Sequence, residues 1–131
     1  VDLLTSLDLL EHLSKDDALT FLDECYKSLK TGGTLILRTP CADGFFGAHD
    51  ASNDITHKWN MSSNLMRSIL EMCGYKEIQI LEERPQPENF IESIRWLVYW
   101  PSRYLFNFVC VLLALRPPKV ISRSMILIAY K

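Results

Sequence analysis

The chain has 131 residues, the size of a single domain, and it is long enough to bury a hydrophobic core. Its composition, 48% hydrophobic and 23% charged, excludes a disordered chain, and its net charge of -2 argues against nucleic-acid binding through bulk charge. Four widely spaced cysteines without a C-x-x-C pair favour reduced thiols in a cytoplasmic protein over a disulfide framework or a zinc site.

The first feature along the chain is an apolar run, residues 1–4, followed by a polar stretch. The run predicts a buried strand, and the stretch places Asp8, Glu11 and His12 at or just beyond its carboxyl end. Open α/β sheets bind their ligands beyond the carboxyl ends of the strands, so these three side chains are candidates for chemistry. The alternative is that the two carboxylates only satisfy loop backbone and that His12 is a loop histidine.

A helix and a second strand follow. Ser14 is a good N-cap, and apolar residues then recur at helical spacing until Gly32 and Gly33, which predict the helix end. The apolar face consists of Ala18, Phe21, Leu22, Cys25 and Leu29. Residues 34–39 form a β-rich run that Pro40 closes, and its apolar character is typical of a strand buried on both faces of a parallel sheet. The pattern predicts a strand–helix–strand unit.

A long polar segment, residues 41–60, leaves the end of this second strand and contains His49 and His57. A compact domain rarely keeps about 20 structureless residues without a use for them. We expect His12 and His57 to lie on the same side of the sheet. The alternative is a solvated surface loop.

The remaining sequence predicts one more helix and two more strands. Ser62 or Ser63 caps a helix that Gly74 ends. Residues 75–83 alternate in polarity, which indicates a strand near the sheet edge, and residues 120–130 form the last strand. The order of elements predicts an α/β fold.

Between these two strands lies a segment of different character, residues 90–116, rich in aromatic residues. From residue 93 to the end, the chain has six basic residues and no acidic one. The segment is too short and too interrupted, by Pro101 and Arg103, for a bilayer span, which needs about 20 apolar residues. We expect two helices joined at Pro101. They would cover a site, lie in a membrane interface, or pack on the protein's own core or a second subunit.

A lid or an interfacial helix would expose its aromatic side chains. Residues four apart share a helix face, so four rings at this spacing should form an exposed apolar patch. These are Trp96, Trp100, Tyr104 and Phe108.

Four short motifs in this order of elements resemble the C-terminal half of a class I S-adenosylmethionine-dependent methyltransferase. They are Asp8-Leu-Leu-Glu-His12, Leu29-Lys-Thr-Gly-Gly33, Leu35-Ile-Leu-Arg-Thr-Pro40 and Cys73-Gly-Tyr75. The resemblance implies a partial Rossmann-like sheet, with two parallel strands, a C-terminal antiparallel hairpin and flanking helices. It makes residues 1–131 part of one methyltransferase domain, with residues 88–118 as an aromatic and basic helical insert.

The resemblance also implies S-adenosylmethionine as the cofactor, placed against the end of the first strand at Ser6, Leu7 and Asp8. The sequence contains no G-x-G motif, and the family's cofactor loop would lie before Val1. We therefore expect this chain to be a fragment that by itself does not bind the cofactor appreciably and is inactive.

A narrower resemblance concerns a metal. Some O-methyltransferases of ubiquinone biosynthesis or of small RNAs carry an E-x-x-E-H motif that binds a divalent metal, and the RNA enzymes add a later histidine. The ligands carried over to this chain are Asp8, Glu11, His12 and His57. This oxygen and nitrogen set suits an ion such as Mg²⁺, which would lower the pKa of a substrate hydroxyl. Without a metal, His57 or His49 would be the general base.

The sequence thus predicts a fragment of a methyltransferase that acts on a hydroxyl of a small molecule, glycan or lipid-linked substrate. The protein is expected in the cytoplasm, with membrane-surface association through residues 90–116 as an option. The alternative function is a non-catalytic, truncated methyltransferase-like module that binds a partner or a membrane through the same residues.

Overall fold

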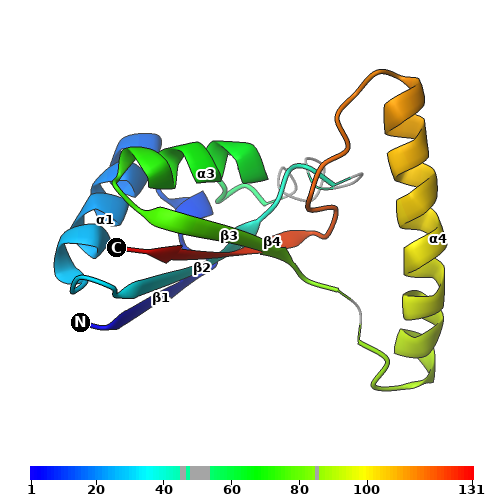
Figure 1. Cartoon of the computed structure of the whole chain (residues 1–131), viewed down its shortest axis with the longest axis horizontal. Coiled ribbons are helices and arrows are strands. Elements are labelled where there is room, and N and C mark those ends of the chain that lie inside the picture. Colours follow the sequence, from blue (N-terminus) through cyan, green and yellow to red (C-terminus); the bar gives the residue numbers. More distant parts are fainter. Residues whose placement is uncertain (45–46, 48–53, 85) are drawn as a thin grey trace.

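The computed structural model describes residues 1–44, 47, 54–84 and 86–131. In chain order the elements are β1 (Leu3–Leu7), a 3-10 turn η1 (Leu10–His12), α1 (Lys15–Ser28), β2 (Thr34–Pro40), α3 (Ser63–Met72), β3 (Lys76–Glu82), α4 (Phe90–Leu112) and β4 (Ser124–Tyr130). The helices α1 and α3 lie over one face of the sheet, whereas α4 stands apart beyond one end of it (Figure 1).

The four strands form one mixed sheet in the order β1-β2-β4-β3. β1 and β2 pair in parallel, with Leu3 opposite Thr34 and Leu7 opposite Arg38. β4 runs antiparallel to both of its neighbours, so the last strand of the chain is inserted between β2 and β3. The prediction of two parallel strands followed by a C-terminal antiparallel pair is confirmed, and β3 lies at the sheet edge as expected.

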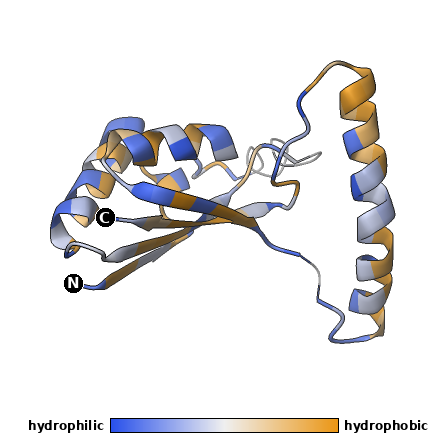
Figure 2. Cartoon of the chain, viewed as in Figure 1, coloured by the Kyte–Doolittle hydropathy of each residue, from blue (hydrophilic) through white to orange (hydrophobic). Residues whose placement is uncertain are grey.

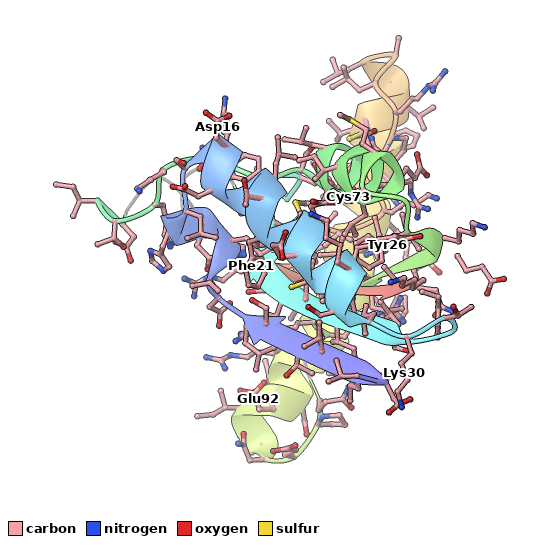
Figure 3. All side chains as sticks on the ribbon, turned by 90° about the vertical axis from the view of Figure 1, so that its left-hand side faces the viewer. Asp16, Phe21, Tyr26, Lys30, Cys73 and Glu92 are labelled. Atoms are coloured by element: carbon pink, nitrogen blue, oxygen red, sulfur yellow. The ribbon has the colours of Figure 1, made fainter. Side chains whose placement is uncertain are left out.

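The helix α1 begins as the sequence predicts. The Ser14 hydroxyl accepts a hydrogen bond from the backbone N–H of Asp17 at 3.1 Å. The chain turns back toward the sheet at Gly32, whose φ of +78° favours glycine because a Cβ would be strained there. Figure 3 looks at this side of the molecule, with Phe21 on the side of α1 toward the strands and Lys30 next to β1. Lys30 pairs there with Asp2 at 3.0 Å.

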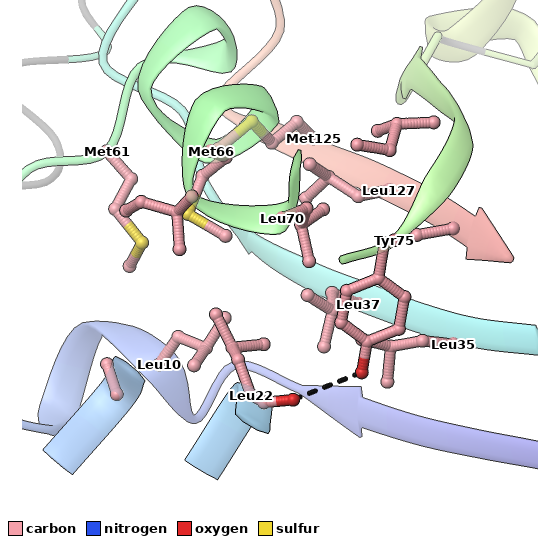
Figure 4. Packing of buried hydrophobic residues seen from close by; sticks show 14 of the residues in the cluster. Leu10, Leu22, Leu35, Leu37, Met61, Met66, Leu70, Tyr75, Met125 and Leu127 are labelled. Atoms are coloured by element: carbon pink, nitrogen blue, oxygen red, sulfur yellow. Dashed lines mark hydrogen bonds between the residues drawn. The ribbon is translucent and has the colours of Figure 1, made fainter. Parts of the chain in front are cut away.

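The hydrophobic core lies between the two helices and the sheet. Leu22 of α1, Leu70 of α3, Leu37 of β2 and Leu127 of β4 are all buried and meet in this layer (Figure 4). The Tyr75 ring is buried beside them, and its hydroxyl donates a hydrogen bond to the carbonyl of Leu22 at 3.2 Å. Burial raises the pKa of this phenol, so the hydroxyl stays a donor at neutral pH. The predicted apolar face of α1 belongs to this core.

The strand β2 differs from the prediction of a strand buried on both faces. Leu35, Leu37 and Thr39 are buried under the helices, whereas Ile36 and Arg38, on the opposite face, are partly exposed. β4 shows the same alternation. The physical reason is that, within the part of the chain that the structure describes, α1 and α3 cover only one face of the sheet.

The last strand begins at Ser124, four residues later than predicted. Upstream of it, the backbone N–H of Ile121 donates to the Glu82 carboxylate at 3.3 Å instead of joining the ladder. The Ser122 hydroxyl donates to the carbonyl of Ser124 at 2.6 Å. Hydrogen bonds that involve side chains therefore take the place of strand pairing here.

The helix α4 corrects the prediction of two helices joined at Pro101, because it is continuous with Pro101 inside it. Proline removes a backbone N–H and disfavours helix interiors. However, Tyr99 and Arg103, on either side of it, both donate to Glu82 of β3, at 2.8 and 2.7 Å. One carboxylate thus holds both halves of the helix. Figure 2 shows how much of α4 is hydrophobic, yet no helix within the described ranges meets the length and apolarity needed to cross a membrane.

Candidate active site

The polar stretch after β1 folds into a tight turn at the carboxyl end of the parallel strands. Asp8 has a φ of +50°, which turns the chain out of β1 and into η1. Leu10 of this turn is 1% exposed and anchors it in the core, and this carries the neighbouring Glu11 inside at 2% exposure. The buried Glu11 carboxylate accepts a hydrogen bond from the Thr39 hydroxyl, at the end of β2, at 3.1 Å. A carboxylate is thereby fixed between the ends of two parallel strands.

The segment that carries His57 is tied to this turn by backbone and ring contacts. The backbone N–H of Lys58 donates to the carbonyl of Glu11 at 2.8 Å, and the Trp59 indole donates to the carbonyl of Leu10 at 3.1 Å. These bonds bring His57 against His12, with ring centroids 5.0 Å apart at an interplanar angle of 60°. The prediction that the two histidines lie on the same side of the sheet is confirmed.

Glu11, His12 and His57 together form a cluster of potential metal ligands. One potential ligand atom from each lies within 4.8 Å of those of the other two. Asp8, the fourth ligand carried over from the resemblance, is outside this group, and its carboxylate instead binds Arg38 at 2.7 Å. The structure thus brings together three of the four expected side chains.

A hydrogen-bond chain fixes the orientation of the His12 ring. The Thr56 hydroxyl donates its single proton to Asp54 at 2.6 Å, so its oxygen accepts from Nδ1–H of His12 at 3.0 Å. Hydrogen bonds from the side chain and the backbone N–H of Thr56 also lower the pKa of Asp54, which keeps this carboxylate an acceptor. In a neutral His12 ring this tautomer leaves the lone pair on Nε2, the atom that then faces a metal or a proton.

A cleft of about 510 Å³ opens beside this group. It is lined by Arg38, Pro40, Asp54, His57, Glu83, Arg123 and Ser124. His57 belongs to both the cleft and the three-residue group, and so it connects them. Arg38 is fixed on one side of the cleft because it donates to Glu83 at 2.6 Å and to Asp8 at 2.7 Å. The cleft is located where open α/β sheets bind ligands.

The remaining residues predicted for the site have different environments. The Ser6 hydroxyl is buried and has no hydrogen-bond partner within the described residues, whereas the Leu7 side chain is 61% exposed. His49, the second candidate base, lies outside the described residues. Burial raises the pKa of the Cys41 thiol, just beyond β2, to about 11. All four cysteines are free in the structure, and the raised pKa of Cys41 disfavours a reactive thiolate at this position.

Sequence reasoning missed several residues that build the site: Arg38, Thr39, Asp54, Thr56, Trp59 and Glu83. Two of these residues had a signal that could be recognised in the sequence. Asp54 and Thr56 form an Asp-x-Thr turn, in which the Thr56 N–H donates to the Asp54 side chain at 2.8 Å, and this turn type is recognisable from sequence. The contacts of Arg38 and Thr39 depend on strand neighbours far along the chain, so no local pattern shows them.

No protein-family model and no curated protein matches the chain, but solved structures match its fold. A SAM-dependent methyltransferase from Archaeoglobus fulgidus aligns with a TM-score of 0.70 and 19% identity, over 100% of this chain and 59% of that one. A SAM-dependent methyltransferase from Thermotoga maritima, described as a possible histamine N-methyltransferase, aligns with a TM-score of 0.65 and 16% identity, over 99% and 55%. Phosphoethanolamine N-methyltransferase 2 from Haemonchus contortus, solved with S-adenosylmethionine, aligns with a TM-score of 0.59 and 13% identity, over 99% and 33%.

These alignments show what the chain shares with known proteins. They extend over essentially all of this chain, but this chain spans less than two thirds of each matched protein. Sequence identities this low establish the fold and leave acceptor chemistry open. The chain therefore has the fold of part of a class I S-adenosylmethionine-dependent methyltransferase.

Proposed function

We propose that the polypeptide containing this chain is an S-adenosylmethionine-dependent methyltransferase that methylates a hydroxyl group, in which Glu11, His12 and His57 act on the acceptor. The single observation that carries this proposal is the meeting of these three side chains at a cleft beyond the parallel strands. The fold of the structural neighbours supports the cofactor class. The acceptor hydroxyl belongs to a small molecule, a glycan or a lipid-linked substrate.

The end of β1 fits one border of a cofactor site. Ser6 offers a buried hydroxyl with no partner within the described residues, and such a group is satisfied when a polar ligand binds next to it. Leu7 offers exposed apolar surface, and Asp8 offers a carboxylate that Arg38 already orients. S-adenosylmethionine would supply the electrophilic methyl group.

The Glu11, His12 and His57 group also fits a divalent cation. Neighbouring ligand atoms around a bound ion are roughly 3 Å apart, so a small closure of the residues 54–59 segment would complete the site. Two imidazoles and one carboxylate suit Mn²⁺, Fe²⁺ or Zn²⁺ better than Mg²⁺, because Asp8 is engaged elsewhere. Such an ion would lower the pKa of the acceptor hydroxyl.

When no ion is bound, the chain's own residues activate the acceptor instead. The His57 ring lines the cleft and accepts the proton of the acceptor hydroxyl, and the Asp54 carboxylate, 3.8 Å from its Nε2 atom, stabilises the imidazolium that results. Thr39 and Thr56 are positioning residues, because they hold Glu11 and His12 in place without lining the cleft.

The test is methyl transfer from S-adenosylmethionine carrying a labelled methyl group to a panel of hydroxyl acceptors, by the polypeptide containing residues 1–131. His57→Gln and Glu11→Gln should each lower kcat/KM by about 10²–10⁴-fold, the usual contribution of a positioned acid or base. Lys58→Gln is the matched control, because its side chain is exposed beside the site and should leave the rate unchanged. Equal rates in wild type and both site variants would contradict the assignment.

A second readout does not need an acceptor. Calorimetric titration with Mn²⁺ should show one site that Glu11→Gln weakens about 10-fold or more and that Lys58→Gln leaves intact. If methyl transfer depends on His57 while no divalent ion binds, His57 acts as a base without a metal. If labelled methyl reaches none of the acceptors and no S-adenosylmethionine binds, the alternative function, a non-catalytic methyltransferase-like module, is the better interpretation.

A further inference from the structure

The outer face of α4 is a continuous apolar surface. Its members are large, all are exposed, and they follow one another along the whole helix: Phe90, Ile91, Ile94, Leu97, Val98, Tyr104, Leu105, Phe108, Val109, Val111 and Leu112. At 100° per residue they cover about 160° of the helix circumference, and at 1.5 Å per residue the helix is about 35 Å long. A contiguous exposed apolar surface, rimmed by polar residues, often marks an interaction site.

The opposite face of α4 is attached to the sheet, which fixes the outer face toward the surroundings. The Glu82 side chain is only 3% exposed, and it accepts hydrogen bonds from Tyr99 and from Arg103. The Arg84 guanidinium lies 5.6 Å from the centre of the Trp100 ring, and Cys110 is buried on the same side. The helix therefore cannot turn its apolar face inward without breaking this buried polar anchor.

The groups that border the outer face indicate what covers it. The polar side-chain atoms on this face are the hydroxyls of Tyr104 and, at its edge, of Ser93, which already donates to the carbonyl of Asn89. A partner with directional hydrogen bonds would therefore find almost no groups to pair with. Trp96 is exposed at one border, and Arg95 at the other. Beyond the end of the helix, Arg116 and Lys119 are exposed, and no acidic residue occurs after Glu92. An apolar face bordered by tryptophan and cationic side chains matches the layering of an anionic lipid surface.

We propose that α4 binds the surface of an anionic membrane, lying in the plane of the interface with its outer face among the upper acyl chains. Arg116 and Lys119 contact the lipid phosphates. The segments of chain before and after α4 both reach the cleft, because Glu83 of the first and Arg123 of the second line it. Membrane binding therefore places the cleft at the lipid surface, which, if the proposed function holds, selects an acceptor hydroxyl carried by an amphiphilic lipid.

The test is co-sedimentation of the polypeptide with vesicles of phosphatidylcholine containing about 30% phosphatidylserine, and with phosphatidylcholine alone. No cofactor is added, so the result is independent of methyl transfer. The wild type should bind the anionic vesicles, and Leu97→Gln with Leu105→Gln should weaken binding by at least about 10-fold. Arg116→Gln with Lys119→Gln should weaken binding to anionic vesicles by about 10-fold and leave binding to neutral vesicles unchanged.

The matched control is Ile55→Gln with Met72→Gln, two exposed apolar residues away from α4, which should bind like the wild type. A measurement without any substitution supports the same point, since the combined emission of the three tryptophans, to which the exposed Trp96 contributes, should shift to shorter wavelength when vesicles are added. Equal binding by wild type and by the Leu97 and Leu105 variant overturns the proposal. It is also overturned if the wild type ignores vesicles and forms a dimer that the same variant abolishes, because a second copy then covers the face.

Discussion

The sheet with α1 and α3, and the helix α4, are both rich in apolar residues but are stabilised in opposite ways. In the sheet body, apolar side chains such as Leu37 and Leu70 are buried and belong to one hydrophobic cluster. In α4, apolar side chains such as Leu97 and Leu105 are exposed, and the helix is attached through charged hydrogen bonds around Glu82. Hydrophobic burial therefore holds the body together, whereas one polar cluster positions α4.

The largest expected effect comes from a matched pair of leucine truncations. Leu70→Ala in the body should lower the free energy of unfolding by about 2–5 kcal/mol, because it leaves a cavity in the core. Leu105→Ala on α4 should change it by less than about 0.5 kcal/mol, because that side chain is already 64% exposed. Urea unfolding of both variants measures the difference, and similar losses would mean that α4 belongs to the same core.

The next effect distinguishes two neighbouring carboxylates. Glu82→Gln removes the charge that Arg103 and Tyr99 bind inside the molecule, and should weaken the attachment of α4 by about 1.5–3 kcal/mol. Glu83→Gln should cost less than about 1 kcal/mol, because its pair with Arg38 is partly exposed and Arg38 keeps Asp8.

Limited proteolysis within residues 86–89 and 113–119 reports this attachment directly. Faster cleavage in Glu82→Gln at unchanged stability of the sheet body is the expected result. Equal cleavage of the two variants would show that the buried carboxylate is not what positions α4.

The same carboxylate predicts a dependence on pH. Burial alone would raise the pKa of Glu82, but hydrogen bonds from Arg103, Tyr99 and Ile121 outweigh burial and hold it below its ordinary value of 4.5. Because the folded pKa is depressed, the stabilisation is fully present above about pH 4.5 and is lost as the pH falls below that value. Amide exchange across α4 should therefore speed up in acid in the wild type, and Glu82→Gln should lack this acid-dependent step.

The sequence predicted those parts of the fold that local chemistry decides. The Ser14 cap, the turn at Gly32 and the alternation of β3 each depend on residues a few positions apart, and the structure has all three. The continuity of α4 was predicted wrongly, because proline disfavours a helix locally while the contacts of Tyr99 and Arg103 with Glu82 of β3 come from a distant part of the chain.

In the candidate site, too, the features decided by local sequence were predicted and those decided by distant contacts were not. The motif from Asp8 to His12 identified Glu11 and His12 as polar groups at a strand end, and the structure brings His57 to them. The exclusion of Asp8 from the group could not be predicted, because it depends on Arg38 of the neighbouring strand. The orientation of His12 depends on Thr56 and Asp54, whose position follows from how the 54–59 segment folds back over η1.

The smallest expected effect on overall stability comes from Pro101→Ala, which asks whether α4 unfolds together with the body. Alanine restores the backbone N–H that proline lacks and is about 3 kcal/mol more favourable within a helix interior. If α4 opens independently of the sheet, the free energy of unfolding of the body should change by less than about 0.5 kcal/mol, while amide exchange within α4 slows about 10-fold or more. Hydrogen exchange resolved along the chain measures both quantities in one experiment. A rise of about 3 kcal/mol in the unfolding free energy of the whole domain would instead make α4 and the sheet one cooperative unit, because only then does a gain inside the helix stabilise residues of the distant core.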